Sequence, residues 1–89
     1  MRKFQQNPRF EAAPLNDEAI LFDPVTSNFL MLNRTSSFIW HELAEPGSAE
    51  SLAALVCASF GNVEPVDALT DVKIALEQML KLELVTTSD

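Results

Sequence analysis

The sequence has one cysteine, one histidine and two glycines among 89 residues, and each scarcity excludes a class of site. Because Cys57 is alone, it can form no internal disulfide and no metal site built from several thiolates. Gly47 and Gly61 lie too far apart for a glycine-rich phosphate-binding loop. His41 has only hydroxyls that resemble helix caps nearby in sequence, so it cannot complete a catalytic triad by itself. We therefore expect no enzyme activity, no cofactor and no metal.

Basic residues are scarce as well, since six lysines and arginines stand against thirteen acids and give a formal net charge of −7. Three of the six lie within the first nine residues, and residues 35–72 contain six acids and no lysine or arginine. A surface that binds nucleic acid needs positive charge. We therefore expect no nucleic acid partner.

Long apolar runs are also absent. No run approaches the roughly 20 apolar residues that a membrane helix needs. The first residues include two bases but no apolar segment behind them, which is not the pattern of a secretory signal. These absences predict a soluble, cytoplasmic protein without a membrane partner.

The chain nevertheless contains enough apolar material for one small folded domain. Hydrophobic residues make up 47% of the chain, and six phenylalanines and one tryptophan are available to fill a core. A chain of this length has room for a single domain. Residues 1–9 are polar and show no helical or strand period. We therefore expect a flexible N-terminal arm at residues 1–9, a folded domain over residues 10–85 and a tail at residues 86–89.

Short apolar segments in the first third of the chain predict three strands. Residues 10–13 form the first, and turn-forming residues follow them. Residues 18–23 form the second, which ends at Pro24 because proline cannot donate a ladder hydrogen bond. Residues 29–32 form the third, after a polar link in which Asn28 is the residue that best tolerates a positive φ. The second and third segments predict a β-hairpin.

Three helices are expected in the rest of the chain. Residues 35–37 offer caps for the first helix, which ends before Gly47. The second covers residues 49–60 and the third residues 65–82. The apolar face of the third helix comprises Leu69, Val72, Leu76, Met79 and Leu80, edged by Ala68, Ala75 and Leu82, with Ile74 on the opposite side.

The order of these elements predicts the fold class. Strands come first and helices follow, without the alternation that builds a parallel sheet. We therefore expect an α+β domain with a three-stranded antiparallel sheet followed by three helices. A three-stranded sheet with three short helices has the size of a winged-helix domain.

The hairpin is unusual because both of its faces are apolar. Residues 19 and 21 alternate with the equally apolar residues 20 and 22, and residues 29–32 are apolar throughout. A sheet covered by helices on one side should instead alternate apolar and polar residues. Either the N-terminal arm, the C-terminal tail or a second copy covers the other face, or a partner docks there.

Several short motifs in this order resemble the PqqD-like family, the recognition elements of ribosomally synthesised and post-translationally modified peptides. The resemblance covers roughly residues 10–85. It includes the DPVT turn at residues 23–26, the Leu-Asn pair at residues 32–33, the Ile-Trp pair at residues 39–40 and, within the third helix, Asp71 before spaced leucines and a closing Leu-Val. Residues 27–28 and Glu83 depart from the pattern, because the family commonly has glycine at these points.

The resemblance implies a winged-helix-like fold that binds peptide instead of DNA. Members bind the leader segment of a precursor peptide and present it, as peptide chaperones in natural product biosynthesis, to a radical SAM protein, a cyclase or a leader peptidase. The implied pathway is of the lasso or the pyrroloquinoline quinone type. The leader would join the third strand by β-augmentation, in a groove closed by the third helix. The implied peptide-binding residues are Asn28, Phe29, Leu30, Met31, Leu32 and Asn33 on the strand, and Ala68, Val72, Ala75 and Met79 on the helix.

Two alternatives stay open. The chain would be a structural subunit of an obligate complex if the two-faced hairpin were its interface, and the isolated chain would then aggregate or form a homodimer. A winged-helix DNA-binding regulator would need a basic recognition helix. The absence of bases from residues 35–72 argues against that second alternative.

Overall fold

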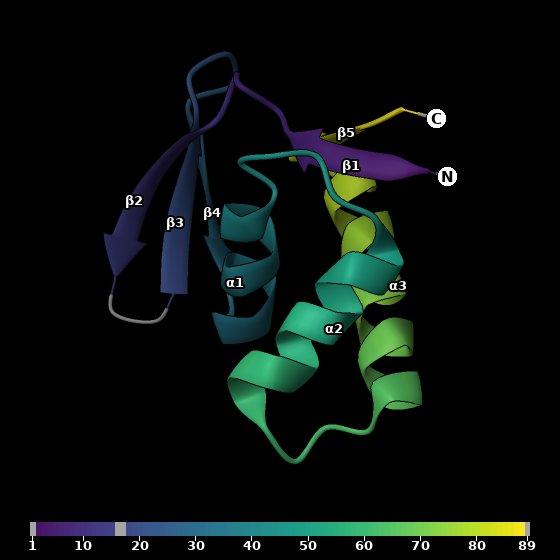
Figure 1. The fold of residues 1–89 in the computed structure, drawn as a ribbon. Helices are drawn as coiled ribbons and strands as arrows, with labels where there is room; N and C mark the ends of the chain where they lie inside the picture. Colours follow the sequence, from purple (N-terminus) through teal and green to yellow (C-terminus); the bar gives the residue numbers. More distant parts are fainter. Residues whose placement is uncertain (1, 16–17, 89) are drawn as a thin grey trace.

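The computed structural model describes residues 2–15 and 18–88 and shows a mixed α+β fold (Figure 1). In chain order its elements are β1 (Lys3–Gln6), β2 (Glu11–Leu15), β3 (Glu18–Asp23), β4 (Asn28–Leu32), α1 (Arg34–Glu42), α2 (Ala49–Phe60), α3 (Pro65–Lys81) and β5 (Val85–Ser88). β2, β3 and β4 form one antiparallel sheet in that order, and β1 pairs with β5 in a second sheet. The expected class, with a three-stranded antiparallel sheet and three helices, is confirmed.

The three helices stand beside the larger sheet (Figure 1). α1 packs against β3 and β4, while α2 and α3 pack against each other. Within the described ranges no single helix is long and apolar enough to cross a membrane, and α2 and α3 meet the length and composition only as a pair bent by 118°.

The expectation of a flexible arm at residues 1–9 is wrong for residues 3–6, which form β1. Phe4 is buried, its N–H donates to the carbonyl oxygen of Gly47 at 2.7 Å, and the N–H of Gly47 donates back at 2.9 Å. Residues 86–88, expected as a tail, belong to β5, and Lys3 pairs with Ser88. A four-residue strand with one apolar side chain has no detectable period, so local sequence could not indicate this pairing.

The turn and cap residues differ in detail from those expected. Asn33, and not residues 35–37, caps α1, since its side chain accepts a hydrogen bond from the N–H of Ser36 at 2.8 Å. In the hairpin turn the positive φ falls on Ser27, at 61°, and not on Asn28. Glu83 also has a positive φ, of 63°, at the position where the family commonly has glycine.

One hydrophobic core joins the helices to both sheets. The expected face of α3 is confirmed at its centre, where Val72, Leu76 and Met79 are almost completely buried. Ile74 lies on the opposite side and is 53% exposed. Trp40 links α1 to the segment before β5, because its indole N–H donates to the carbonyl oxygen of Leu84 at 3.1 Å.

A buried hydroxyl fixes α1 against the hairpin. The N–H of Ala19 on β3 donates to Ser37 Oγ at 2.8 Å, and Ser37 Oγ donates to the carbonyl oxygen of Leu32 on β4 at 3.1 Å. The hydroxyl thereby bridges the two strands at the end of their ladder. This bridge determines where β4 lies relative to the start of α1.

The turn after β3 is held by a nearly buried carboxylate, Asp23. Its Oδ1 accepts from the N–H of Val25 at 2.9 Å, and its Oδ2 lies 3.1 Å from Nη2 of Arg9. Desolvation is the largest influence on the pKa of Asp23 and raises it. Hydrogen bonds from Val25 and Thr26, together with the charge of Arg9, outweigh desolvation and leave the pKa below its usual value.

Candidate functional site

β4 is an edge strand of the larger sheet and lies beside the start of α1. It pairs with β3 on one side, in a register that places Ile20 opposite Met31 and Phe22 opposite Phe29. Among residues 2–15 and 18–88 no strand pairs with its other side. An edge strand presents alternate N–H and C=O groups that can bind an added strand. β4 therefore offers main-chain hydrogen bonds to an extended peptide.

The side chains of β4 alternate between the core and the solvent. Leu32 is buried and Leu30 half-buried on the core side, whereas Phe29 is 70% and Met31 66% exposed. Asn28 and Asn33 are exposed at the two ends. The structure thus brings the six predicted strand residues together on one edge, but only part of the set is accessible to a partner.

The four predicted residues on α3 lie in the core and not on an open wall. Ala68 and Val72 are fully buried, and Met79 and Ala75 are 3% and 9% exposed. The face of α3 that carries spaced apolar residues is the face that packs against the rest of the protein. Of the four, Ala75 also lines a groove.

That groove lies between the start of α1 and the neighbouring face of α3 and encloses about 240 Å³. Its lining residues are the cap Asn33, Thr35 and Ser36 from α1, and Asp71, Ile74, Ala75 and Gln78 from α3. Sequence reasoning missed Asp71, Ile74 and Gln78 as wall residues. A signal for this wall was present in the sequence, because Ile74 is an apolar residue on the polar side of an amphipathic helix.

The groove carries polar groups around one exposed apolar side chain. The carboxylate of Asp71 and the amides of Asn33 and Gln78 can bind hydrogen-bond donors, while Ile74 offers apolar contact. No lysine or arginine lines it among the described residues. The groove is therefore suited to a segment with apolar side chains and donors or positive charge.

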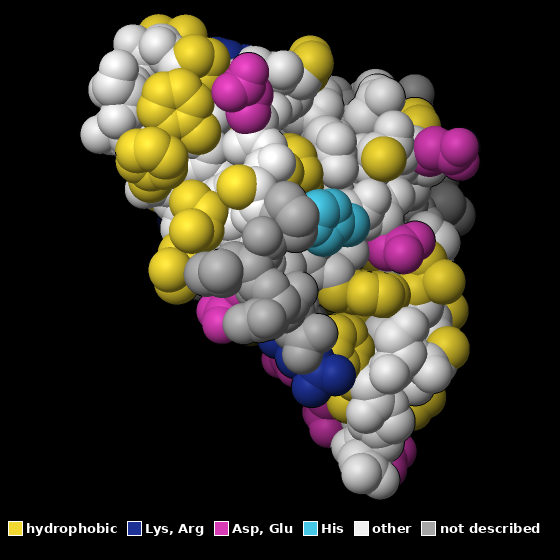
Figure 2. Space-filling model, turned by 90° about the vertical axis from the view of Figure 1, so that its left-hand side faces the viewer, with side chains coloured by type: hydrophobic (Ala, Val, Ile, Leu, Met, Phe, Trp, Pro, Cys, Tyr) yellow, Lys and Arg dark blue, Asp and Glu magenta, His cyan; other side chains and the backbone are white. Residues whose placement is uncertain are grey.

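The outer face of the larger sheet is apolar and open. Ile20 and Phe22 from β3 lie beside Phe29 and Met31 from β4, and the rings of Phe22 and Phe29 are 4.9 Å apart. A shallow cavity of about 340 Å³ lies over Phe22, Phe29 and neighbouring residues of β2. Figure 2 shows hydrophobic side chains gathered over this part of the surface. β1 and β5 form a separate sheet, which lies on the α3 side of the molecule and away from this face (Figure 1).

The residues considered for catalysis or metal binding lie apart from this site. His41 is exposed, and its ring is 5.7 Å from the ring of Trp40. Cys57 is half-buried, and its thiol lies 3.6 Å from the carbonyl oxygen of Val63. The part of the chain that the structure describes contains no group of three or more histidine, cysteine or acidic side chains arranged to hold a metal.

Two solved structures have the same fold. One is TbiB1 in complex with the TbiA(beta) leader peptide, which has a TM-score of 0.81 and 23% identity over 91% of this chain and 93% of that one. The other is lasso peptide synthetase B1 complexed with the leader peptide, which has a TM-score of 0.79 and 20% identity over 93% of this chain and 96% of that one. No curated protein matches with significant similarity.

The family is shown by sequence. The model of the family described as coenzyme PQQ synthesis protein D (PqqD) matches residues 18–85, which is more than half of the chain. The match includes the hairpin, all three helices and the first residue of β5. The chain therefore belongs to the PqqD family.

Proposed function

We propose that this protein binds the leader segment of a ribosomally synthesised precursor peptide by adding it as a strand to β4. The observation that carries the proposal is the unpaired edge of β4, beside the groove between α1 and α3. Two structures with this fold are described as complexes with leader peptides, which supports the same role here. Main-chain hydrogen bonds to β4 supply affinity in this mode, and alternate side chains supply selectivity.

The geometry revises which residues would read the leader. Alternate side chains of an added strand point to opposite faces of the sheet. On one face they lie next to Phe29 and Met31, and on the other they enter the groove beside Ile74. Ala68, Val72 and Met79 then act through the core, by holding α3 in position.

Presentation to an enzyme completes the proposed role. The protein recognises the precursor by its leader segment, and a modifying enzyme or leader peptidase then acts on the attached precursor. We place no catalytic residue in this chain itself.

A calorimetric titration of the purified chain with a synthetic leader peptide of a candidate precursor tests the proposal. We expect saturable 1:1 binding to the peptide and none to duplex DNA. No binding to the peptide by a folded, monomeric sample would contradict the proposal.

The groove is tested separately by Ile74→Lys. Ile74 is 53% exposed, so the fold tolerates lysine there, but the bulkier charged side chain would obstruct an apolar contact with the leader. We expect affinity to fall at least tenfold. Leu82→Lys is the matched control, because Leu82 is 50% exposed at the end of the same helix and does not line the groove. Equal affinities of the two variants would remove the groove from the site.

The open outer face of the sheet favours a second candidate role, in which the chain is a subunit of an obligate complex. This role predicts that the isolated chain aggregates or dimerises through Phe29 and Met31. Sedimentation velocity distinguishes the two roles, since a peptide-binding module is expected to be a stable monomer without its peptide.

A further inference from the structure

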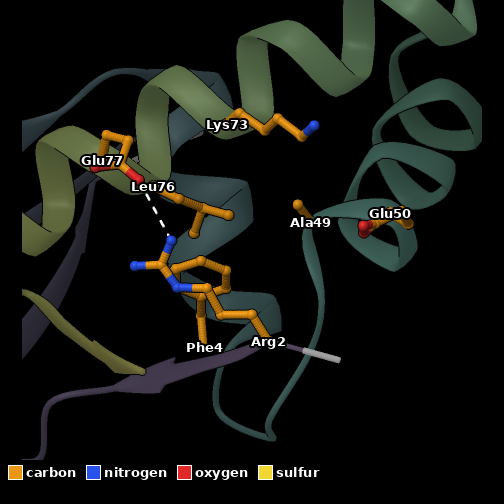
Figure 3. Close-up of a pocket in the computed structure, with 7 residues that line it drawn as sticks. All are labelled: Arg2, Phe4, Ala49, Glu50, Lys73, Leu76 and Glu77. Carbon is orange, nitrogen blue, oxygen red and sulfur yellow. Dashed lines mark ion pairs between the residues drawn. The ribbon is translucent and has the colours of Figure 1, made fainter. Parts of the chain in front are cut away.

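A second cavity, of about 430 Å³, lies on another side of the molecule, between β1, the start of α2 and α3 (Figure 3). Its floor is apolar and consists of Phe4, Ala49 and Leu76, all at least nine-tenths buried. Its rim carries charged side chains, namely Arg2, Glu50, Lys73 and Glu77. An apolar floor inside a charged rim is the form of a pocket that receives a single anchoring side chain.

Two of the four rim charges are already engaged. A guanidinium nitrogen of Arg2 lies 3.5 Å from a carboxylate oxygen of Glu77, and the guanidinium carbon lies 4.9 Å from the centre of the Phe4 ring. Arg2 Nε also donates to Thr87 Oγ1 at 3.1 Å. These contacts link the residue before β1 to α3 and β5, and they line one wall of the cavity.

The other two rim charges have no ion-pair partner among the described residues. Lys73 extends from α3 toward α2, and Glu50 stands on α2 beside the opening (Figure 3). The opening therefore presents one cation and one anion, on different walls, that a partner can pair with. A complementary ligand carries an apolar group between an acidic and a basic group.

The cavity and the leader groove use opposite sides of α3. Lys73, Leu76 and Glu77 line the cavity, whereas the groove is lined by Asp71, Ile74, Ala75 and Gln78. At about 100° per residue the centres of these two sets lie roughly opposite each other around the helix axis. An occupant of the cavity therefore does not displace a strand added at β4.

We propose that this cavity is the docking site for the enzyme that receives the bound leader. It takes a leucine-, methionine- or phenylalanine-sized side chain of that enzyme, flanked on the enzyme surface by an acid for Lys73 and a base for Glu50. This inference rests on the proposed function. A second copy of the chain is a poorer occupant because two chains of net charge −7 repel each other.

The test titrates a candidate partner enzyme, a leader peptidase, into the full chain with and without saturating leader peptide. In Lys73→Glu we expect enzyme affinity to fall at least tenfold and leader affinity to stay within twofold of wild type. The matched control is Lys3→Glu, which makes the same charge change. Lys3 lies on β1 between the lining residues Arg2 and Phe4 but does not itself line the cavity, so this variant should leave both affinities unchanged. Ala49→Leu fills the floor of the cavity without changing its charge. In a sample shown to be folded, this variant should lower the affinity for the enzyme by a similar factor.

The outcomes separate this inference from the proposed function. A wild-type chain that fails to bind leader contradicts the proposed function, while enzyme binding to the leader-free chain still tests the cavity. Wild-type enzyme affinity in Lys73→Glu, equal losses in Lys73→Glu and Lys3→Glu, or displacement of leader by enzyme would each overturn the docking site. So would a wild-type dimer that Lys73→Glu dissociates, because the cavity would then be a contact between copies.

Discussion

At the scale of single residues, the buried hydroxyl of Ser37 links α1 to both strands of the hairpin. It accepts from Ala19 and donates to Leu32, so it satisfies two backbone groups that would otherwise be buried without partners. We expect Ser37→Ala to lower the free energy of unfolding by about 1–3 kcal/mol, because the bridge is lost and water cannot easily replace it. Urea denaturation measures the loss.

Ser36→Ala is the control for this change. Ser36 is the neighbouring residue and is only half-buried, and its backbone N–H, which the substitution keeps, makes the contact to the Asn33 cap. We expect its effect to stay within about 0.5 kcal/mol. Equal denaturation midpoints for the two variants would show that the bridge does not contribute to stability.

Asp23 predicts a pH dependence at the turn after β3. Its pKa is lower in the folded chain than in the unfolded chain. A carboxyl group of this kind stabilises the fold fully above its unfolded pKa of about 3.9, and the contribution is lost as pH falls through the lower folded value. The difference in thermal midpoint between wild type and Asp23→Asn should therefore be constant near neutral pH and shrink below about pH 4. A difference that persists unchanged to pH 2 would contradict this origin.

At the scale of elements, β4 combines an open edge with two exposed apolar side chains. Met31 is 66% exposed, so Met31→Asp places a charge next to the proposed leader strand without burying it in the core. We expect leader affinity to fall at least tenfold. The control is Val25→Asp, at a residue 72% exposed in the adjoining turn, which should bind leader as wild type does. Unchanged affinity in Met31→Asp would remove this strand from the site.

The sequence predicted one face of α3 but not the groove beside it. Its 3.6-residue period correctly indicated which residues face the core, including Val72 and Met79. The period could not show that a groove lies along the neighbouring face, with Asp71 and Ile74, because the groove depends on where α1 begins in space. Val72→Glu would accordingly test folding and not binding, since Val72 is fully buried.

At the scale of the whole molecule, the order of strands and helices was sufficient to predict the fold class. The second sheet was not predictable, because Lys3 pairs with Ser88 from the far end of the chain and neither strand has an apolar period. In the docking proposal this sheet also forms part of a binding surface. It places Phe4 and Arg2 against α3 and so creates the cavity on the side away from the leader groove.

The net charge of −7 also belongs to this scale. An acidic carrier attracts a leader or an enzyme surface that carries basic residues and binds it more weakly as salt screens the interaction. In the groove the carboxylate of Asp71 adds to this negative charge, and no described lysine or arginine lines the groove to offset it.

The central claim, that a leader adds a strand to β4, is tested most directly by amide hydrogen exchange with and without the leader peptide. An added strand would protect alternate amides of residues 28–33, which face solvent in the unbound chain. We predict slower exchange there, and no change in β2 at the other edge of the same sheet. Saturating leader peptide with unchanged exchange along β4 would contradict the account, because the peptide would then be bound elsewhere.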